Sequence, residues 1–298
     1  MAFKSGFVSI IGAPNVGKST LLNALLQQKV AITSPRPQTT RHRIRGILHL
    51  PEAQIVFVDT PGIHDASIPY NKYMVQLAVE TLQEVDVILF MIEPFPKGLE
   101  DGRHIIGTYL SQLDKPCILL INKVDKIAKP QLLPIMDEFS KLYPFKAIIP
   151  ISAKKQAGLE DILKETLSYL PEGPQYYPED YITDQTERQI VAEIIREKII
   201  HATRDEIPYC VAVTVEEFRE VPEKNMIYIR ATIHVERDSQ KGIIIGKRGQ
   251  KLKSIGQAAR EEIELILGQK VFLDLFVRVQ ESWRRDPRAW AQLGLKVD

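Results

Sequence analysis

The stretch GAPNVGKS, residues 12–19, decides the fold of the first half of the chain. It matches the pattern G-x-x-x-x-G-K-[S/T], it directly follows the apolar run GFVSIIG (6–12), and it opens a helix-like segment at 18–28. Glycines in this context let consecutive backbone N–H groups point inward at the positive end of a helix, where they bind phosphate. The sequence therefore predicts a nucleotide phosphate loop. Its expected phosphate contacts are Gly12, Asn15, Val16, Gly17, Lys18, Ser19 and Thr20.

Outward from this loop, short apolar runs alternate with helix-like segments as far as residue 172. The runs are rich in β-branched residues, as is typical of strands buried on both faces of a parallel sheet. They lie at 6–12, 53–60, 85–92, 116–122 and 145–152, and helices are expected at 18–28, 70–83, 101–113, 130–141 and 159–170. RGILHL (45–50) is expected to add one antiparallel strand through a hairpin. Residues 1–172 are thus predicted to form a doubly wound α/β domain with a mostly parallel sheet and its ligand at the carboxyl ends of the strands.

Two polar motifs end later strands of this sheet and indicate which base is bound. NKVD (122–125) ends one strand and SAK (152–154) ends the last. The Asp125 carboxylate can accept hydrogen bonds from N1–H and N2–H₂ of guanine, whereas adenine presents an unprotonated N1 at that edge. Loss of a designed hydrogen bond can discriminate by ~10⁴. The sequence therefore predicts a guanine pocket formed by Asn122, Lys123, Asp125, Ser152, Ala153 and Lys154.

The stretch DTPGI (59–63) and the polar segment TSPRPQTTRHRIR (33–45) are the expected switches. The Gly62 N–H is expected to bind the γ-phosphate, so that hydrolysis releases the segment that follows. Thr40, rather than Thr39, is expected to coordinate Mg²⁺ together with Ser19 and Asp59, while Lys18 reaches the β- and γ-phosphate oxygens. Ile63 stands where many GTPases carry a glutamine that orients water. The basic residues within 41–45 fit either a solvated loop or a direct RNA contact, and the sequence leaves both open.

The second half of the chain has a different order of elements. The proline-rich stretch PEGPQYYPEDYIT (171–183) reads as a linker, which we place at 173–183. A helix (184–204), two strands (208–217 and 226–236), helical segments around 239–267 and a strand (270–279) are expected next. This α+β order, with GKRG (246–249) before a long helix, is typical of a type II KH domain over 184–298. The expected RNA contacts are Lys241, Ile243, Ile244, Ile245, Gly246, Lys247, Arg248, Gly249, Lys251 and Lys253, and the groove is also expected to use Leu252 and Ile255.

The C-terminal tail allows two interpretations. Arg284, Arg285 and Arg288, near Trp283 and Trp290, fit either extra phosphate contacts or a simple packing segment.

Composition limits the remaining possibilities. The formal net charge of the 298 residues is only +1, so nucleic-acid affinity must come from local clusters of basic residues. Cys117 and Cys210 lie in apolar runs and are expected to be buried, reduced thiols. No leader peptide precedes the first strand and no apolar run approaches the ~20 residues that span a bilayer, so we expect a cytoplasmic protein. No heptads or large apolar patch favour an obligate oligomer, and we expect a monomer.

Together, GAPNVGKST, QTTR, DTPG, NKVD and SAK resemble the Era/TrmE group of translation-factor-class GTPases, and the whole chain resembles the Era family. The resemblance implies a slow GTPase that needs Mg²⁺ and is stimulated by K⁺, with the K⁺ ion held beside Asn15 where an arginine finger would otherwise reach. Asn15, Lys18, Thr40 and Gly62 are then the expected catalytic residues. It also implies binding to the 3′ end of 16S ribosomal RNA, assembly of the 30S subunit, and peripheral association with the inner membrane. The alternative is a membrane-associated signalling GTPase whose C-terminal domain binds protein.

Overall fold

The computed structural model describes residues 2–295, which divide into two compact units. Unit 1 comprises the described residues up to 33 together with 37–67 and 72–184. Unit 2 comprises residues 34–36 and 68–71 together with the described residues from 185 onward. The boundary at 184/185 lies within two residues of the predicted start of the second domain. No helix among residues 2–295 is both long enough and apolar enough to cross a membrane.

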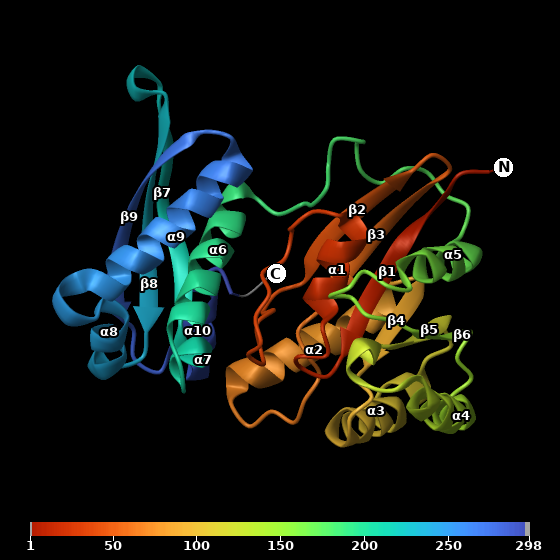
Figure 1. Cartoon of the computed structure of the whole chain (residues 1–298). Helices are drawn as coiled ribbons and strands as arrows, with labels where there is room; N and C mark the ends of the chain where they lie inside the picture. Colours follow the sequence, from red (N-terminus) through yellow and green to blue (C-terminus); the bar gives the residue numbers. More distant parts are fainter. Residues whose placement is uncertain (1, 296–298) are drawn as a thin grey trace. The chain divides into compact units, whose positions relative to one another are not determined.

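Unit 1 is built on a six-stranded sheet in the described part of the chain, with the order β2-β3-β1-β4-β5-β6 (Figure 1). The strands are β1 (Lys4–Gly12), β2 (Ile44–Leu50), β3 (Ala53–Asp59), β4 (Val87–Ile92), β5 (Cys117–Ile121) and β6 (Ala147–Pro150). β2 pairs antiparallel with β3, and the other neighbours are parallel. All six predicted strands are therefore confirmed, including the antiparallel one.

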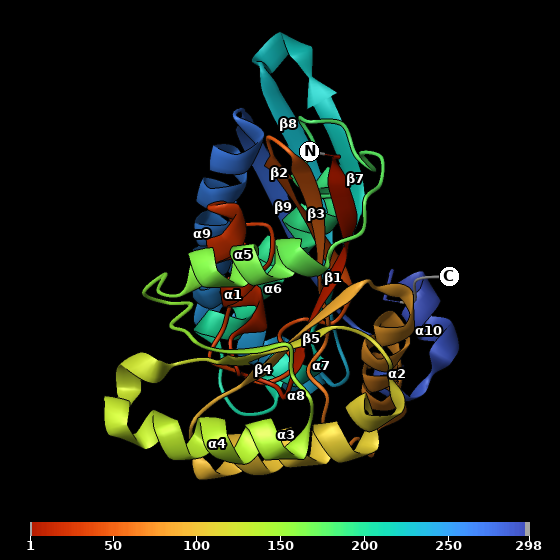
Figure 2. The ribbon, with the colours of Figure 1, turned by 90° about the vertical axis from the view of Figure 1, so that its right-hand side faces the viewer.

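Helices lie on both faces of this sheet (Figure 2), which explains why β3, β4 and β5 are buried along their whole length. They are α1 (Lys18–Leu26), α2 (Pro69–Glu84), α3 (Pro96–Thr108), α4 (Leu132–Leu142) and α5 (Leu159–Tyr169). α3 begins five residues before the predicted start at 101, because Pro96 suits a first helical turn, where its missing N–H costs nothing. The doubly wound architecture is confirmed, and β1, β3, β5 and β6 end at the same edge of the sheet.

The predicted linker is not a free segment. Its backbone carbonyls accept hydrogen bonds from the Ser5 hydroxyl of β1, to Pro174 at 2.6 Å, and from the Ile47 N–H of β2, to Ile182 at 2.9 Å. Gln54, which is fully buried in β3, accepts hydrogen bonds from the N–H groups of Tyr176 and Tyr177 and donates one to the Tyr177 carbonyl at 2.7 Å. A buried amide must be satisfied in this way, so the linker is fixed along unit 1 although its composition is typical of a loop.

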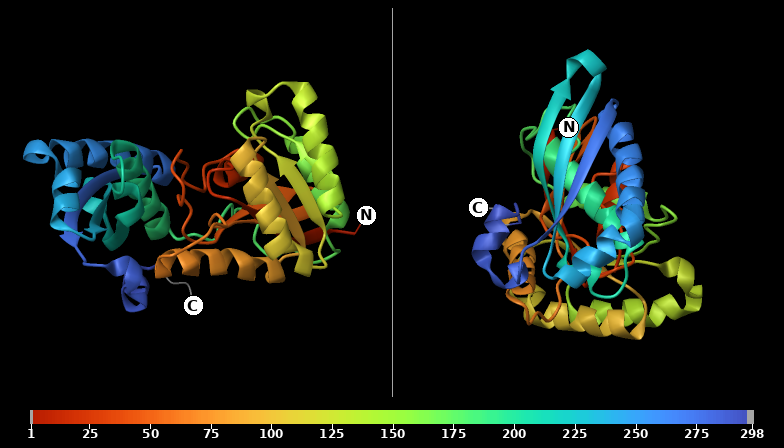
Figure 3. Two further views of the ribbon diagram at one scale, coloured as in Figure 1. Left: turned by 90° about the horizontal axis from the view of Figure 1, so that it is seen from below. Right: turned by 90° about the vertical axis from the view of Figure 1, so that its left-hand side faces the viewer.

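Unit 2 is an α+β domain with a three-stranded sheet in the order β7-β8-β9 (Figure 3). Its elements are α6 (Glu187–Ala202), α7 (Ile207–Cys210), β7 (Ala212–Val221), β8 (Met226–Val235), α8 (Asp238–Ile245), α9 (Gln250–Leu267), β9 (Lys270–Val279) and α10 (Pro287–Gln292). β7 and β8 are antiparallel, whereas β8 and β9 are parallel. The strand predicted from 208 starts at 212, because Pro208 lies in the short helix α7. Both cysteines are free and buried, as predicted.

Candidate functional site

The phosphate loop joins β1 to α1 at the end of the sheet. Gly17 has a φ of 105°, and a Cβ atom there would lie 2.5 Å from Nδ2 of Asn122, so only glycine fits. The Lys18 side chain is almost fully buried, and its ammonium donates hydrogen bonds to the carbonyl oxygens of Gly12 (3.3 Å) and Ala13 (3.0 Å). Burial lowers the pKa of Lys18 to about 8, partly offset by the charge of Asp59. The loop thus holds a desolvated cation whose partners are two neutral carbonyls, which suits it to exchange them for phosphate oxygens.

Three oxygen ligands meet beside this loop. The Asp59 Oδ2 accepts hydrogen bonds from the Ser19 hydroxyl (2.6 Å) and the Thr40 hydroxyl (3.1 Å), and the two hydroxyls are 2.8 Å apart. Asp59 is fully buried, and its second oxygen, Oδ1, has no hydrogen-bond partner in the described part of the chain. Burial raises the pKa of Asp59, against the lowering effects of Lys18 and the two hydroxyls. Hard oxygen ligands around one orphaned carboxylate oxygen fit Mg²⁺, and these are the three residues that the sequence assigned to it.

The expected base pocket is organised by Asn122. Its Nδ2 donates to the Val16 carbonyl at 2.7 Å, and its Oδ1 accepts from the Ala153 N–H at 3.0 Å. This one buried amide therefore ties the phosphate loop to the SAK segment. The Asp125 carboxylate accepts from the Ser152 hydroxyl at 2.6 Å, and this hydrogen bond lowers the pKa of Asp125.

Two further residues define the edge of that pocket. Lys123 adopts a left-handed conformation, and its ammonium donates to the Asn15 carbonyl at 2.7 Å and pairs with Glu93. Sequence reasoning missed Glu93, although it directly follows β4 at the same edge of the sheet. Lys154, which was also expected in the pocket, is exposed.

The segment after Asp59 is docked on the phosphate loop. The Ile63 N–H donates to the Gly12 carbonyl at 3.1 Å, and the Ile63 side chain belongs to the hydrophobic core of unit 1. A Cβ atom at Gly62 would lie 2.7 Å from Pro14 Cα, so the close approach requires glycine. Ile63 is therefore a packing residue.

Gln38 and His64, which the sequence did not single out, connect the two expected switches. Their Nε2 atoms lie 3.0 Å apart, and His64 Nδ1 lies 2.8 Å from the Gly62 carbonyl. Because the amide nitrogen of glutamine only donates, His64 Nε2 accepts and its Nδ1 carries the proton.

The sequence left two interpretations open for the basic residues within 41–45, a solvated loop or a direct RNA contact. Arg41 is 2% exposed, and Arg43 pairs with Glu84 at 2.7 Å and Glu80 at 3.4 Å. Arg45 pairs with Asp184 at 2.7 Å. Arg41 is therefore a buried residue of unit 1, whereas Arg43 and Arg45 form ion pairs at its surface, where the Arg45 side chain is 42% exposed.

In unit 2 the GKRG loop separates α8 from α9. Gly246 and Gly249 have φ values of 69° and 76°, and a Cβ at Gly246 would lie 2.7 Å from Cβ of Lys251. Lys247 and Arg248 are exposed at the tip. The remaining expected contacts that reach the surface fully or in part are Lys241, Ile243, Ile245, Gly249, Lys251, Leu252 and Lys253.

Two groove assignments are wrong. Ile244 is fully buried and Ile255 is 2% exposed, and both belong to the core of unit 2. On a helix, neighbouring positions are about 100° apart, so Ile243 and Ile245 can face outward while Ile244 faces the core.

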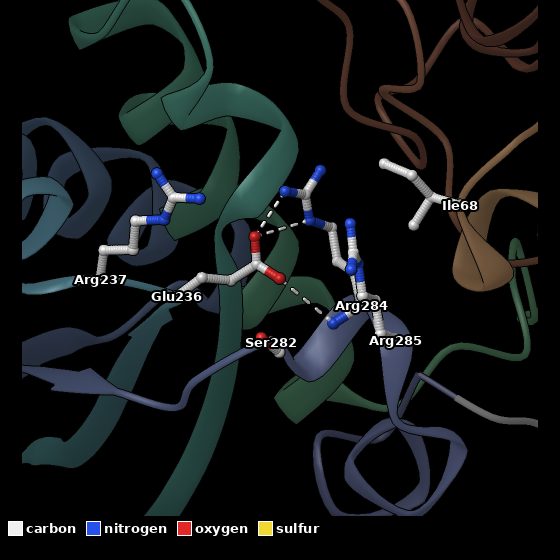
Figure 4. Close-up of a pocket in the computed structure, with 6 residues that line it drawn as sticks. All are labelled: Ile68, Glu236, Arg237, Ser282, Arg284 and Arg285. Atoms are coloured by element: carbon white, nitrogen blue, oxygen red, sulfur yellow. Dashed lines mark hydrogen bonds and ion pairs between the residues drawn. The ribbon is translucent and has the colours of Figure 1, made fainter.

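The C-terminal tail packs against unit 2. Trp283 is fully buried and its indole N–H donates to the Cys210 carbonyl at 2.9 Å, while the Trp290 indole donates to the Trp283 carbonyl at 2.8 Å. Glu236 accepts hydrogen bonds from the Arg284 guanidinium (Figure 4). Glu236 and Arg284 line a small pocket of unit 2, and Arg285 lines it too. The structure therefore favours the packing interpretation of this tail for both tryptophans and for Arg284.

Comparison with known proteins agrees with both halves of this description. Residues 7–123 match the family described as 50S ribosome-binding GTPase, and residues 206–284 match the KH domain family. GTPase Era of Geobacter metallireducens is 53% identical over 292 residues, which cover 98% of each chain. GTPase Era of Ruminiclostridium cellulolyticum is 51% identical over 298 residues, covering 100% of this chain and 99% of that relative.

Solved structures extend the comparison. A crystal structure of Era in complex with MgGDPNP and nucleotides 1506–1542 of 16S ribosomal RNA matches with a TM-score of 0.95 and 46% identity, covering 99% of this chain and 100% of that one. A variant of Aquifex aeolicus Era bound to GDP·AlF₄⁻ matches with a TM-score of 0.94 at the same identity and coverage. Identity of about one half over nearly the full length of both chains shows the family. The chain belongs to the family of Era GTPases.

Proposed function

We propose that this protein is a GTP-dependent RNA-binding switch that binds the 3′ end of 16S ribosomal RNA and assists assembly of the 30S subunit. The observation that carries the proposal is the presence in one chain of a guanine-type pocket and a three-oxygen Mg²⁺ site, together with an exposed GKRG loop. The Era structure that holds MgGDPNP and a 16S fragment supports this pair of ligands.

The residues of unit 1 divide the work of hydrolysis. Ser19, Thr40 and Asp59 would hold Mg²⁺, which supplies positive charge to the phosphate oxygens when it is bound. Lys18 would exchange its carbonyl partners for β- and γ-phosphate oxygens and stabilise the charge that develops there. The Gly62 N–H would bind the γ-phosphate. Because Ile63 is buried, water placement falls to backbone groups of the switches, which is consistent with a slow intrinsic rate.

We infer in addition that K⁺ stimulates the reaction beside Asn15. The amide side chain of Asn15 offers a neutral oxygen, a ligand suited to a large monovalent cation, and the residue is exposed at the rim of the phosphate loop. We expect faster hydrolysis in K⁺ than in Na⁺, and we expect Asn15→Ala to remove the difference. Asn225→Ala is the matched control, because Asn225 is also exposed and also has a positive φ. Equal rates of the wild type in the two salts would contradict the inference.

Unit 2 would bind a single RNA strand through the GKRG loop, where glycines let the backbone approach the sugar-phosphate chain and Lys247 and Arg248 supply charge. In this proposal the protein acts as a monomer, and its partner is the 30S subunit. Peripheral contact with the inner membrane is part of it as well, as the family resemblance implies.

Filter binding of a 16S 3′-end oligonucleotide tests the switch. We expect tighter binding with a nonhydrolysable GTP analogue than with GDP or without nucleotide, and equal affinity in the three states would remove the switch. Lys247→Glu with Arg248→Glu should abolish RNA binding, whereas the matched charge reversal at exposed Lys224 should not. Retention of RNA binding after the double reversal would overturn the assignment of the loop and favour a protein-binding module.

A further inference from the structure

The sheet of unit 2 carries an aromatic surface that the GKRG loop does not use. Helices α6 and α9 pack on one face of the sheet (Figure 1). Along β9, side chains alternate between the two faces, and Phe272 and Phe276 are 53% and 50% exposed, whereas Val271 between Lys270 and Phe272 is buried. Phe272 and Phe276 therefore lie on one face of one strand, about 13 Å apart along it at ~3.3 Å per residue, with both rings about half open to solvent.

The rings are ordered as a stack. Tyr228 on β8 is in register with both Arg219 on β7 and Phe272 on β9. The Arg219 guanidinium lies 4.7 Å from the centre of the Tyr228 ring, and the rings of Tyr228 and Phe272 are parallel within 10° at 5.7 Å. Planar groups from three strands therefore line up across the sheet. The row reaches Phe272 on β9, which is an edge strand of the described sheet.

A second, shorter row repeats this chemistry. The Arg230 guanidinium lies 5.8 Å from the centre of the Phe276 ring and 5.9 Å from that of Tyr228. Ion pairs hold these two arginines in place, from Arg219 to Glu217 at 2.7 Å and from Arg230 to Asp274 at 3.7 Å. Fixed guanidinium planes next to aromatic rings lose little side-chain entropy when a ligand binds.

We propose that this outer face of the sheet, defined by Arg219, Tyr228, Arg230, Phe272 and Phe276, is a second surface for single-stranded RNA, on which bases continue the stacked rows. The inference rests on the proposed function, because it assumes that an RNA strand reaches unit 2 through the GKRG loop. Every base has a π-face that can stack on an aromatic ring or on a guanidinium plane, so such a surface binds with little sequence preference.

Charge complementarity favours RNA over an apolar peptide as the occupant. At the two ends of the exposed strand face, Lys270 and Arg278 are both exposed and flank the two phenylalanines. The outward positions of β9 therefore carry a cation at each end and the two rings between them, and Asp274, which separates the rings, is paired with Arg230. Rings flanked by cations suit a chain that carries both bases and phosphates, whereas an apolar helix or strand offers no negative charge to Lys270 and Arg278.

Oligonucleotides of two lengths test the proposal. Fluorescence anisotropy would compare a short 16S 3′-end RNA that fills the GKRG loop, ~6 nucleotides, with one of ~20 nucleotides. We expect the wild type to bind the longer RNA more tightly. We expect Phe272→Leu with Phe276→Leu to weaken only the longer RNA, by at least about fivefold, because stacking on each ring is lost. Phe272→Tyr with Phe276→Tyr should retain the tighter binding, since the rings remain.

The controls separate this surface from the GKRG loop. Lys247→Glu with Arg248→Glu should weaken both RNAs, and Leu265→Ala, at an 82% exposed apolar position on α9, should weaken neither. Suppose that Phe272→Leu with Phe276→Leu binds both RNAs as the wild type does, while Lys247→Glu with Arg248→Glu loses both. The proposed function then stands and this inference is overturned. The inference is also overturned if the wild type sediments in a concentration-dependent way and Phe272→Leu with Phe276→Leu does not. That result would identify a second copy of the chain as the occupant of this surface.

Discussion

Lys18 is a buried cation, and its burial predicts how the stability of unit 1 changes with pH. The pKa of Lys18 is lowered to about 8 in the folded state, from 10.5 in the unfolded chain. At pH 7 the lysine is protonated in both states, and its desolvation destabilises the fold by about 3 kcal/mol. Between pH 8 and 10.5 the unfolded chain binds more protons than the folded one, so the contribution of Lys18 to stability improves as pH rises.

The magnitude follows from the two pKa values. Integration of proton binding reduces the destabilisation to about 1.4 kcal/mol at pH 9.5, so the Lys18 contribution changes by about 2 kcal/mol from pH 7 to 9.5. Most other titrating groups contribute equally to the wild type and to Lys18→Met. Asp59 also responds to the substitution, because Lys18 lowers its pKa, so the difference between the two free energies of unfolding reports Lys18 together with its effect on Asp59.

The assay is urea denaturation of nucleotide-free protein followed by circular dichroism at several pH values. We expect Lys18→Met to be more stable than the wild type at pH 7 and to lose about 2 kcal/mol of that advantage by pH 9.5. Lys129→Met, at an exposed lysine of the same unit, is the control and should show no such trend. A difference that stays constant within about 0.5 kcal/mol over this range would refute the reasoning, because the wild type would then carry no desolvated ammonium.

Three further predictions concern the rest of the nucleotide site. Asp125→Asn should weaken GDP binding by at least about a hundredfold and improve binding of the xanthine nucleotide. The reason is that the new amide can donate to the carbonyl that xanthine carries where guanine has an N–H donor. Calorimetry with both nucleotides checks this. Asn122→Ala should destabilise unit 1 by about 2–4 kcal/mol, since it leaves the Val16 carbonyl and the Ala153 N–H buried without partners; urea denaturation measures it, and a loss within error of zero would contradict it. Ile63→Gln should not accelerate hydrolysis, and it should cost about 1–3 kcal/mol of stability by placing an amide in the core; a severalfold faster single turnover would argue that the side chain reaches the nucleotide.

The sequence predicts those parts of the protein that depend on short-range pattern. Runs of β-branched residues give the strands, and a glycine-rich loop between a strand and a helix leads to the phosphate loop. The three oxygens of the proposed Mg²⁺ site come from separate segments, yet Ser19 and Asp59 lie at a helix start and a strand end, so their meeting could be expected. NKVD and SAK likewise end neighbouring parallel strands, and the structure joins them through Asn122.

Contacts that depend on side-chain direction or on distant partners could not be predicted. The GIII run of α8 has no polar interruption, so nothing in it shows that Ile244 alone turns inward. The partners of Arg43 and Arg45 lie 37 to 139 residues away in the chain. The composition of residues 173–183 predicts only a linker, but the tyrosine N–H groups of this segment satisfy the buried amide of Gln54. Each of these contacts depends on which side chains and backbone groups the fold buries away from water. The sequence alone does not show which groups those are.

Ile63 has no catalytic chemistry, but it anchors the segment that carries Gly62. Its N–H is bonded to the Gly12 carbonyl and its side chain is 3% exposed in the core of unit 1, while Gly62 lies against Pro14. The adjacent Gly62 N–H would bind the γ-phosphate, and the buried isoleucine resists any large displacement of this docked segment. A glutamine would weaken that anchor by exposing the segment to water. The hydrophobic residue therefore restricts the segment to small movements that end at the same backbone contacts. This restriction is consistent with the proposed switch, in which slow hydrolysis would end an RNA-binding event.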